Sequence, residues 1–438
     1  MTDKKKVALC TVRKHRVISA ASPPEGLLFF GKLLKDAGYD VRVFDILIDH
    51  AEEIFLQVMD FDPFLICFNL STGSAMRESI DLSGRFQRKN KIVVWRGAMP
   101  TLAPEYCLDN CPADYIMRGE GEKVIVQLAN VLSKNQKVNI HGVVPMGSTD
   151  HGEILKLSTE EVAHLEPGWD FINVDDYVRE YKRGMRFIRF SLSRGCDGGC
   201  AFCSVSRNKP GWRPYDEKNL LKQLEYIRSR CEFNGIFYID DNLFGWKTDP
   251  TKLAILEKIN VPWVGHVRVD KINSESAKWF KKVKCLVAKI GAESGSNSIL
   301  KSVGKGFKAE DILEAAKVLR EQDIMIYMSF IAGLPGEGER EFNETLELVE
   351  RLAEIDEKVL IHLCHFAPYP GTRGWKMALK HGFTPPENLC DWDNVDLSMP
   401  NVDWVDKEKM VPLVDKLNQK YFVERFQKMN DLRLGPKR

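Results

Sequence analysis

Short apolar runs alternate with amphipathic helical patterns along most of the chain, in two successive series. In the first series the apolar runs are residues 6–10, 41–46, 63–70, 92–95 and 113–117. This alternation predicts parallel strands joined by helices, which form a doubly wound, Rossmann-like α/β sheet. Ligands of such sheets bind beyond the carboxyl ends of the strands, so the loops after these runs are the candidate binding loops.

The second series contains six apolar runs, again with a helical pattern in each gap, and predicts a partial (β/α)6 barrel. The runs are residues 187–192, 235–239, 263–269, 286–290, 325–331 and 359–366. Chemistry in such barrels lies at the carboxyl ends of the strands. We expect the first domain over residues 1–148, a linker over 149–184, the barrel over 185–375 and a short C-terminal extension over 376–438.

Charge and cysteine content narrow the function classes. The 63 basic residues almost balance the 62 acidic ones, which does not favour a nucleic-acid partner or a membrane surface. We find neither a secretory leader nor an apolar stretch of about 18 residues, and we expect a cytoplasmic protein that does not enter a membrane. Thiols stay reduced there, so clustered cysteines among the 11 present indicate metal binding rather than disulfides.

Three cysteines lie within eight residues, directly after the first expected barrel strand. They are Cys196, Cys200 and Cys203, with Gly195, Gly198 and Gly199 among them to allow a tight loop with positive φ angles. Thiolates in this pattern suit an iron–sulfur cluster or zinc. A structural zinc site usually has four protein ligands, and the next cysteine, Cys231, is far along the chain. Three ligands would leave one iron of a 4Fe-4S cluster open.

The Cys-x3-Cys-x2-Cys spacing, together with segments at the ends of later strands, resembles the radical S-adenosylmethionine (AdoMet) superfamily. This resemblance implies that Cys196, Cys200 and Cys203 bind a 4Fe-4S cluster and that AdoMet binds its open iron. The segments are 238–242, 291–295, 331–337 and 369–372. The residues that the resemblance assigns to AdoMet binding are Phe202, Tyr238, Asp240, Glu293, Ser329, Gly333 and Leu334.

Charged residues near these strand ends are candidates for contacts with AdoMet or substrate. Arg268 and Asp270 follow the third expected strand and are candidate catalytic residues, with a salt bridge at the rim as the alternative. Lys301 and Lys305 follow Glu293, and we expect both to be solvated.

Residues 1–148 resemble the cobalamin-binding domain that precedes the barrel in one radical-SAM subgroup. The segments that carry this resemblance are 23–27, 69–73, 96–101 and 118–122, and the implied cobalamin contacts are Leu70, Ser71, Thr72, Gly97 and Glu120. Two features depart from the pattern. No Asp-x-His-x-x-Gly stretch is present, and Arg96 stands where a glycine is usual, so a domain without cobalamin remains an alternative. In that case we expect Arg96 to fill the crevice, paired with a carboxylate or with backbone carbonyls.

The expected function follows from these cofactors. AdoMet cleavage to a 5′-deoxyadenosyl radical, combined with cobalamin, predicts C-methylation of an unactivated carbon in a small molecule or biosynthetic intermediate. An external electron donor such as flavodoxin or ferredoxin is then needed. Without cobalamin the alternative is a radical-SAM dehydratase, lyase or rearrangement enzyme. A third alternative is a non-enzymatic zinc or iron–sulfur binding protein.

Overall fold

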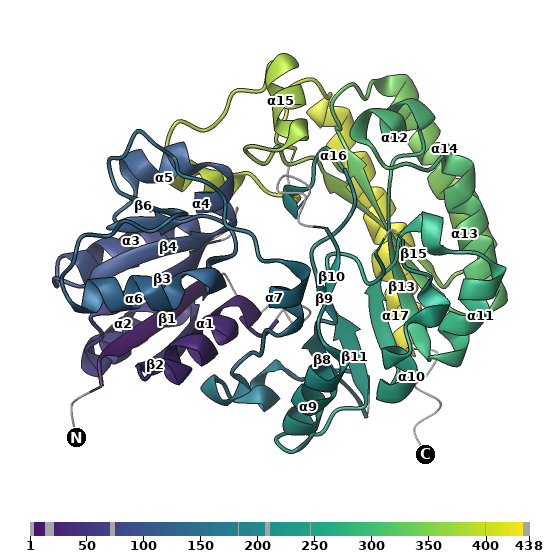
Figure 1. Ribbon diagram of the computed structural model, residues 1–438. Coiled ribbons are helices and arrows are strands. Elements are labelled where there is room, and N and C mark those ends of the chain that lie inside the picture. The colour runs from purple at the N-terminus through teal and green to yellow at the C-terminus, as the bar shows by residue number, and fades with distance from the viewer. Residues whose placement is uncertain are drawn as a thin grey trace. The chain divides into compact units, whose positions relative to one another are not determined.

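The computed structural model divides the protein into two compact units, each with its own sheet (Figure 1). It describes residues 4–13, 22–70, 75–182, 184–205, 211–245, 247–398 and 400–431. Unit 1 comprises Met1–Tyr177, Lys222–Cys231 and Pro385–Asp396, and unit 2 comprises Val178–Leu221, Glu232–Thr384 and Leu397–Arg438.

Unit 1 contains a doubly wound sheet, as the sequence predicts. The strand order is β2-β1-β3-β4-β5-β6, and the strands are parallel except for β6, which runs antiparallel to β5. Their bounds are β1 (Lys6–Arg13), β2 (Asp40–Leu47), β3 (Leu65–Leu70), β4 (Ile92–Gly97), β5 (Tyr115–Met117) and β6 (Val143–Pro145). The order reverses between β1 and β3, which places a topological switch point at the carboxyl ends of these strands.

Helices cover both faces of the unit 1 sheet because its strands are apolar on both sides. One face packs against α1 and α6 through residues such as Val7, Cys67 and Val94, while Phe68 on the other face packs against Phe86 of α3. The helices are α1 (Glu25–Asp36), α2 (Ala51–Phe61), α3 (Met76–Gln87), α4 (Ala98–Leu102), α5 (Pro104–Asn110), α6 (Ile125–Ser133) and α7 (Thr159–Ala163). Helix α1 follows Pro23 and Pro24 as predicted, and Gly38 after it has φ +94°, which suits a helix stop.

A segment from late in the chain completes unit 1. Residues 385–396 contain the 3-10 helix η7 (Leu389–Asn394), which packs beside α3 and α5. The Asp393 carboxylate accepts a hydrogen bond from the Met76 backbone N–H at 2.7 Å, at the N-terminus of α3, where a negative charge is favourable. The fully buried Trp392 ring lies 5.4 Å from the Tyr106 ring, centroid to centroid.

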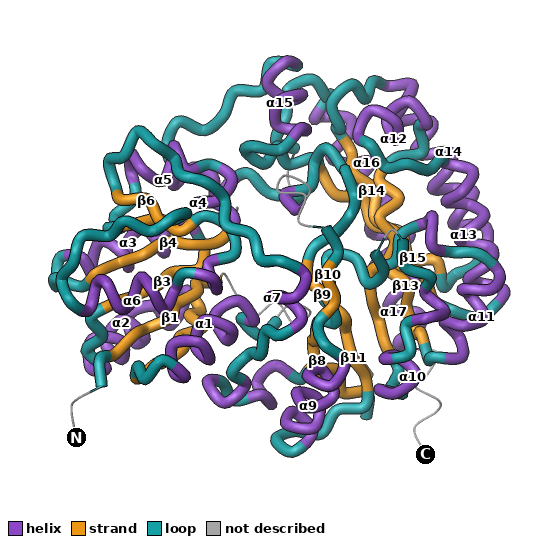
Figure 2. The backbone as a smooth tube through the Cα atoms, viewed as in Figure 1, coloured by secondary structure: helices purple, strands orange, loops and turns teal. Residues whose placement is uncertain are grey.

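Unit 2 contains an open, curved sheet of seven strands, six of them parallel (Figure 2). The order is β15-β14-β13-β12-β11-β8-β7, and only β7 is antiparallel to its neighbour. The bounds are β7 (Arg179–Lys182), β8 (Met185–Phe190), β11 (Gly235–Tyr238), β12 (Trp263–His266), β13 (Cys285–Glu293), β14 (Met325–Ala332) and β15 (Val359–His365). A short pair, β9 (Ser193–Arg194) and β10 (Arg213–Pro214), follows β8.

Helices cover the convex face of this sheet (Figure 2). They are α10 (Ile255–Ile259), α11 (Ser274–Lys282), α12 (Asn297–Val303), α13 (Ala309–Glu321), α14 (Glu339–Ile355) and α15 (Arg373–Lys380); α9 (Glu217–Arg228) spans the division between the units. The six parallel strands match the six predicted runs. The partial barrel and the α/β class are therefore confirmed.

The C-terminal residues form helices that the sequence analysis did not predict. These are α16 (Lys407–Asn418), the π-helical turn η8 (Gln419–Val423) and α17 (Glu424–Asp431). The Asn418 side chain accepts from the Leu363 N–H at 2.8 Å and donates to the Leu363 carbonyl at 3.0 Å. It therefore provides the two hydrogen bonds that a neighbouring strand would make to Leu363 at the edge of the sheet. The expected linker likewise has structure, since α7 lies within it. No helix in the described part of the chain is long and apolar enough to cross a membrane.

Candidate active site

The three cysteines lie in an irregular loop that follows β9, at the carboxyl end of the half-barrel. Each of the three is partly exposed. A Cβ built on Gly198 would lie 3.2 Å from Cys196 Sγ and 3.8 Å from Cys200 Sγ, so these two sulfur atoms flank the space beside Gly198. The Gly198 N–H also donates to Cys196 Sγ at 3.3 Å. Two thiols that share one space fit the donor set of an iron–sulfur cluster.

The glycines of this loop differ in their roles. Gly195 has φ +84°, as the sequence analysis expects, whereas Gly198 and Gly199 do not have positive φ angles. Gly198 is instead required for space, because a side chain there would crowd Cys196 Sγ. Across the described ranges, His, Cys, Asp and Glu side chains form no group of three or more arranged to hold a metal ion as they stand. Participation of Cys203 in the same centre stays a prediction.

Segments after β13, β14 and β15 converge on the cysteine loop. The Ala201 N–H donates to the Val303 carbonyl at 2.7 Å, and the Gly374 N–H donates to the Ala201 carbonyl at 2.6 Å. Ala201 also belongs to an apolar cluster with Ile331 and Leu334, against which Phe202 packs. The loop is therefore fixed by backbone bonds and by burial, and the Gly333-Leu334 segment lies close to it as the family pattern implies.

Glu293 ends β13 in an unusual conformation. Its φ angle is +69°, and the β13–β14 register shifts between Gly291 and Glu293, which marks a bulge. The carboxylate turns back over Gly291, where an added Cβ would lie only 2.2 Å from Oε1. It pairs there with Lys305 Nζ at 3.0 Å, and both side chains are buried. A positive φ costs a non-glycine residue free energy, so this geometry marks a site where the placement of the carboxylate matters.

The exposure of Lys305 differs from what the sequence predicts. It was expected to be solvated, but it is 6% exposed, whereas Lys301 is exposed as expected. The neighbouring Glu293 carboxylate keeps the pKa of the Lys305 ammonium above its ordinary value despite burial. No local sequence pattern indicates that Lys305 is buried, because Glu293, whose charge offsets the cost of burial, is 12 residues away in sequence.

Arg268 and Asp270 lie beside this pair. Arg268 Nε contacts Asp270 Oδ1 at 2.8 Å, and its Nη2 donates to the Lys305 carbonyl at 2.8 Å. The Arg268 Nη1 atom lies 3.4 Å from the position of a Cβ on Gly198. The guanidinium therefore joins the cysteine loop to the Glu293–Lys305 pair and provides positive charge near the thiols.

The remaining predicted residues occupy different positions around the strand ends. Asp240 is buried and accepts hydrogen bonds from the Leu192 N–H, at 3.1 Å, and from the Ser193 hydroxyl, so it holds the segment that leads into the cysteine loop. The Tyr238 ring faces the convex side and lies 6.0 Å from the Trp263 ring. Ser329 lies on the concave side, in register with Gly291.

The Gly333-Leu334 segment is organised by a buried carboxyl group. Gly333 has φ +82°, and its N–H donates to Glu337 Oε2 at 2.5 Å. Burial raises the pKa of Glu337 to about 7. Among the described atoms Glu337 Oε1 has no hydrogen-bond partner, so the carboxyl group is suited to carry a proton there.

The cobalamin candidates lie at the strand ends of unit 1. Gly97 has φ +107°, and a Cβ there would lie 2.3 Å from the Leu70 carbonyl oxygen, so glycine at this position lets the ends of β3 and β4 approach closely. Ser71 and Thr72 lie outside the described residues. The Glu120 carboxylate accepts from the Leu157 N–H at 2.7 Å.

The Arg96 side chain lies on the face of the sheet that packs against α1. Its Nη1 donates to Asn69 Oδ1 at 3.1 Å, and its guanidinium lies 4.3 Å from the centre of the Phe30 ring. The described residues provide no carboxylate for it and leave its Nε without a hydrogen bond. Among the described residues the guanidinium therefore pairs with the Asn69 side chain and not with a carboxylate or a backbone carbonyl, and the role of Arg96 in the cobalamin-free alternative stays a prediction.

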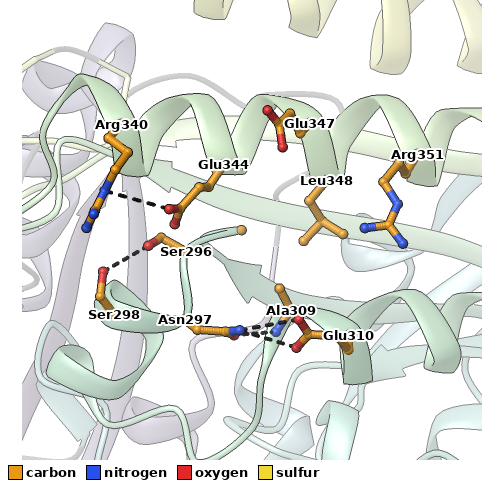
Figure 3. Close-up of a pocket in the computed structure, with 11 residues that line it drawn as sticks. Ser296, Asn297, Ser298, Ala309, Glu310, Arg340, Glu344, Glu347, Leu348 and Arg351 are labelled. Atoms are coloured by element: carbon orange, nitrogen blue, oxygen red, sulfur yellow. Dashed lines mark hydrogen bonds and ion pairs between the residues drawn. The ribbon is translucent and has the colours of Figure 1, made fainter.

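A separate pocket lies on the convex side, between the start of α12 and the helices α13 and α14 (Figure 3). Two polar contacts lie within it: Arg340 contacts Glu344 at 3.8 Å, and Asn297 donates to Glu310 at 3.3 Å (Figure 3). None of the predicted site residues lines it, so it is not the site described above.

The fold and the cysteine loop define a class of α/β protein in which a doubly wound, cofactor-binding sheet precedes an open parallel barrel. Residues 190–349 match the family model of the radical SAM superfamily, and residues 17–129 match that of the B12 binding domain. The chain therefore has a radical SAM domain and a B12-binding domain, and it is a radical SAM enzyme, as the sequence motifs predict. A radical SAM domain implies a 4Fe-4S cluster and AdoMet.

Curated relatives and solved structures agree with these matches. An uncharacterized methyltransferase of Pyrococcus horikoshii is 26% identical over 400 residues, which cover 87% of this chain and 84% of that protein. Hopanoid C-3 methylase of Methylococcus capsulatus is 25% identical, with 84% and 71% covered. The radical S-adenosylmethionine methyltransferase TsrM from Kitasatospora setae superposes with a TM-score of 0.68 at 16% identity, covering 87% of this chain and 78% of that one, and so shares the fold.

Proposed function

We propose that this enzyme is a cobalamin-dependent C-methyltransferase that acts on a small molecule or a biosynthetic intermediate. The observation that carries the proposal is the presence of both domains in one chain, each with a candidate site at the carboxyl ends of its own strands. Relatives named as a methyltransferase and a methylase support it. When bound, the cluster with AdoMet supplies a hydrogen-abstracting 5′-deoxyadenosyl radical, and cobalamin supplies the methyl group.

Different residues of unit 2 would bind the cluster, bind AdoMet and position the cysteine loop. Cys196, Cys200 and Cys203 would hold the cluster. The Glu293–Lys305 pair and Ser329 would orient AdoMet through charge-assisted and neutral hydrogen bonds. Arg268 would offset negative charge at the thiols, while Asp240 positions the cysteine loop through Leu192 and Ser193. Phe202, Gly333 and Leu334 would form the apolar and backbone surface beside the nucleoside.

In unit 1, Leu70, Ser71, Thr72, Gly97 and Glu120 would surround cobalamin. Glycine at position 97 lets the ends of β3 and β4 lie close together at the carboxyl edge of the sheet, where ligands of doubly wound sheets bind. An external one-electron donor such as flavodoxin or ferredoxin would complete the system. We place the enzyme in the cytoplasm, where such donors are found.

Cobalt retention tests the proposal. The chain with its cluster reconstituted is incubated anaerobically with hydroxocobalamin and desalted, and cobalt and iron are then measured. We expect about one cobalt for every four irons. Thr72→Trp should lose cobalt and keep iron, because the added ring fills the cofactor site but not the core of unit 2. Thr159→Trp places the same ring at an exposed position of unit 1 and should retain cobalt.

Absence of retained cobalt in the unaltered protein would refute the methyltransferase. It would instead favour a cobalamin-free radical enzyme that performs dehydration, elimination or rearrangement. Iron that is lost together with cobalt in Thr72→Trp would show that the substitution damages the whole chain, and the role of Thr72 would then be rejected.

A further inference from the structure

The concave face of the half-barrel carries a half-buried cationic cluster that the proposed cofactor sites do not use. Strand register places Arg189, Phe237, Lys289 and Tyr327 on this face, because Phe237 pairs with Arg189 and Lys289 pairs with Tyr327 in neighbouring parallel strands. Lys289 also lies on the same side of β13 as Gly291, since side chains alternate along a strand. The Glu293 carboxylate turns back over Gly291 and so lies on this side too. The cluster therefore lies on the wall that leads toward the candidate AdoMet site.

Aromatic rings flank the Lys289 ammonium. Its Nζ lies 4.9 Å from the centre of the Phe237 ring and 5.2 Å from the centre of the Tyr327 ring. The Arg189 guanidinium lies 4.8 Å from the centre of the same Phe237 ring. Each cation–π contact stabilises its charge, but two cations over one ring repel each other. The Lys289 ammonium is thus favourable for a negative group and unfavourable for a positive one.

No carboxylate among the described residues forms an ion pair with Lys289. Glu293 lies two positions beyond Gly291 on the same face, but it is held 3.0 Å from Lys305. Burial and repulsion by Arg189 lower the pKa of Lys289 to about 8, so at neutral pH the side chain still carries a proton that it holds less tightly than usual. A ligand anion would relieve both the desolvation and the repulsion.

Aromatic rings also lie beside the cluster at the β14–β15 end of the concave face. The Phe422 ring of η8 lies 5.7 Å from the Tyr327 ring and 5.4 Å from the His362 ring, and His362 itself stacks on Tyr327. Because Asn418 fixes this C-terminal segment to β15, the rings form a stable apolar surface beside the cations. Flat apolar groups bind such surfaces.

We propose that the substrate of this site carries an anionic group, a carboxylate or a phosphate, which binds Lys289, and a planar apolar part that packs against Phe237 and Tyr327. This inference rests on the proposed function, because it takes the concave face to be the substrate site. Lys289 is then the residue that selects for negative charge, and Arg189 supports it from the neighbouring side of Phe237. Orientation of the anion at Lys289 directs the rest of the substrate along β13 toward Glu293.

Small probes test the charge preference without turnover. Benzoate, phenyl phosphate and neutral benzamide are titrated into the full chain with its cluster reconstituted, and binding is followed by saturation-transfer NMR. We expect benzoate or phenyl phosphate to bind at least about tenfold more tightly than benzamide, as one charge-assisted hydrogen bond would give. The tighter of the two anions identifies the group that the natural substrate presents.

Variants test whether Lys289 is the source of the preference for anions. Lys289→Met and Lys289→Gln should each abolish it, so that anion and amide bind alike, while Lys289→Arg should retain it. Lys301→Met, which removes an exposed lysine after the same strand, should behave as the unaltered protein. Equal binding of anions and benzamide to the unaltered protein, or an anion preference that survives in both neutral variants, would overturn the inference.

The outcomes are separable from those of the cobalt experiment. Probe binding needs neither cobalamin nor an electron donor. Retained cobalt with no anion preference would refute this inference alone. Lost cobalt with the anion preference intact would refute the methyltransferase and leave Lys289 as an anion site of a cobalamin-free radical enzyme.

Discussion

Gly291→Ala tests whether the position of the Glu293 carboxylate controls AdoMet binding. The added Cβ would lie 2.2 Å from Glu293 Oε1, whereas ordinary contact begins at 3.4 Å, so the carboxylate must shift by about 1.2 Å. A shift of this size moves the carboxylate away from its present position, 3.0 Å from Lys305 Nζ. If one charge-assisted hydrogen bond to AdoMet is lost, the cost is about 1.5–3 kcal/mol, or roughly a 10- to 150-fold weaker affinity.

Equilibrium dialysis of labelled AdoMet against the anaerobically reconstituted chain measures this change. Glu293→Ala should weaken binding by a similar factor, and the double variant should be no weaker than either single variant, because both remove the same contact. Gly265→Ala is the matched control on the neighbouring strand β12, since a Cβ there meets its neighbours at an ordinary 3.4 Å. AdoMet affinity of Gly291→Ala within twofold of the unaltered protein, at equal iron content, would refute the reasoning.

Two further predictions concern the cluster and a buried carboxyl group. Cys200→Ala should abolish the brown iron–sulfur absorbance and AdoMet cleavage, while Cys107→Ala, in the core of unit 1, should keep near-normal iron; four irons and full cleavage in Cys200→Ala would exclude that cysteine as a ligand. Burial raises the pKa of Glu337 from 4.5 to about 7, so the folded state binds more protons than the unfolded state between these values, and stability falls as pH rises through this window. Glu337→Gln cannot ionise, so its free energy of unfolding should not fall in this way. Relative to the unaltered protein, the variant should become more stable between pH 5 and pH 8, by up to about 3 kcal/mol. A stability difference that does not depend on pH would contradict the assigned pKa.

The sequence predicts the architecture well because strand and helix periodicities are local signals. All six predicted barrel runs become parallel strands, and the cysteine loop follows the first of them. The extent of β13 is less predictable: the pattern ends at residue 290, yet the strand continues through a bulge to Glu293. The positive φ of Glu293 occurs together with its contact with Lys305, and no short window of sequence contains that contact.

Side-chain partners account for most of what the sequence analysis missed. Lys305 looks like a surface residue until Glu293 is placed beside it. Lys289 did give a usable signal, because a lysine within the buried run 286–290 is unusual and requires a reason. The C-terminal helix α16 could also have been found, since Asp406 caps it and Met410 and Val414 repeat at helical spacing. Pro412 within that helix obscures the pattern.

The return of residues 385–396 to unit 1 has a consequence for how the chain is made. A ribosome that has finished residue 177 must add more than 200 residues before Trp392 and Asp393 emerge, which takes about 10 to 40 seconds at ordinary elongation rates. During that interval the surfaces around Tyr106 and the N-terminus of α3 await their partners. The B12-binding domain is therefore first in the gene but is completed almost last in synthesis, and a fragment that stops at residue 177 would expose apolar surface that the whole protein buries.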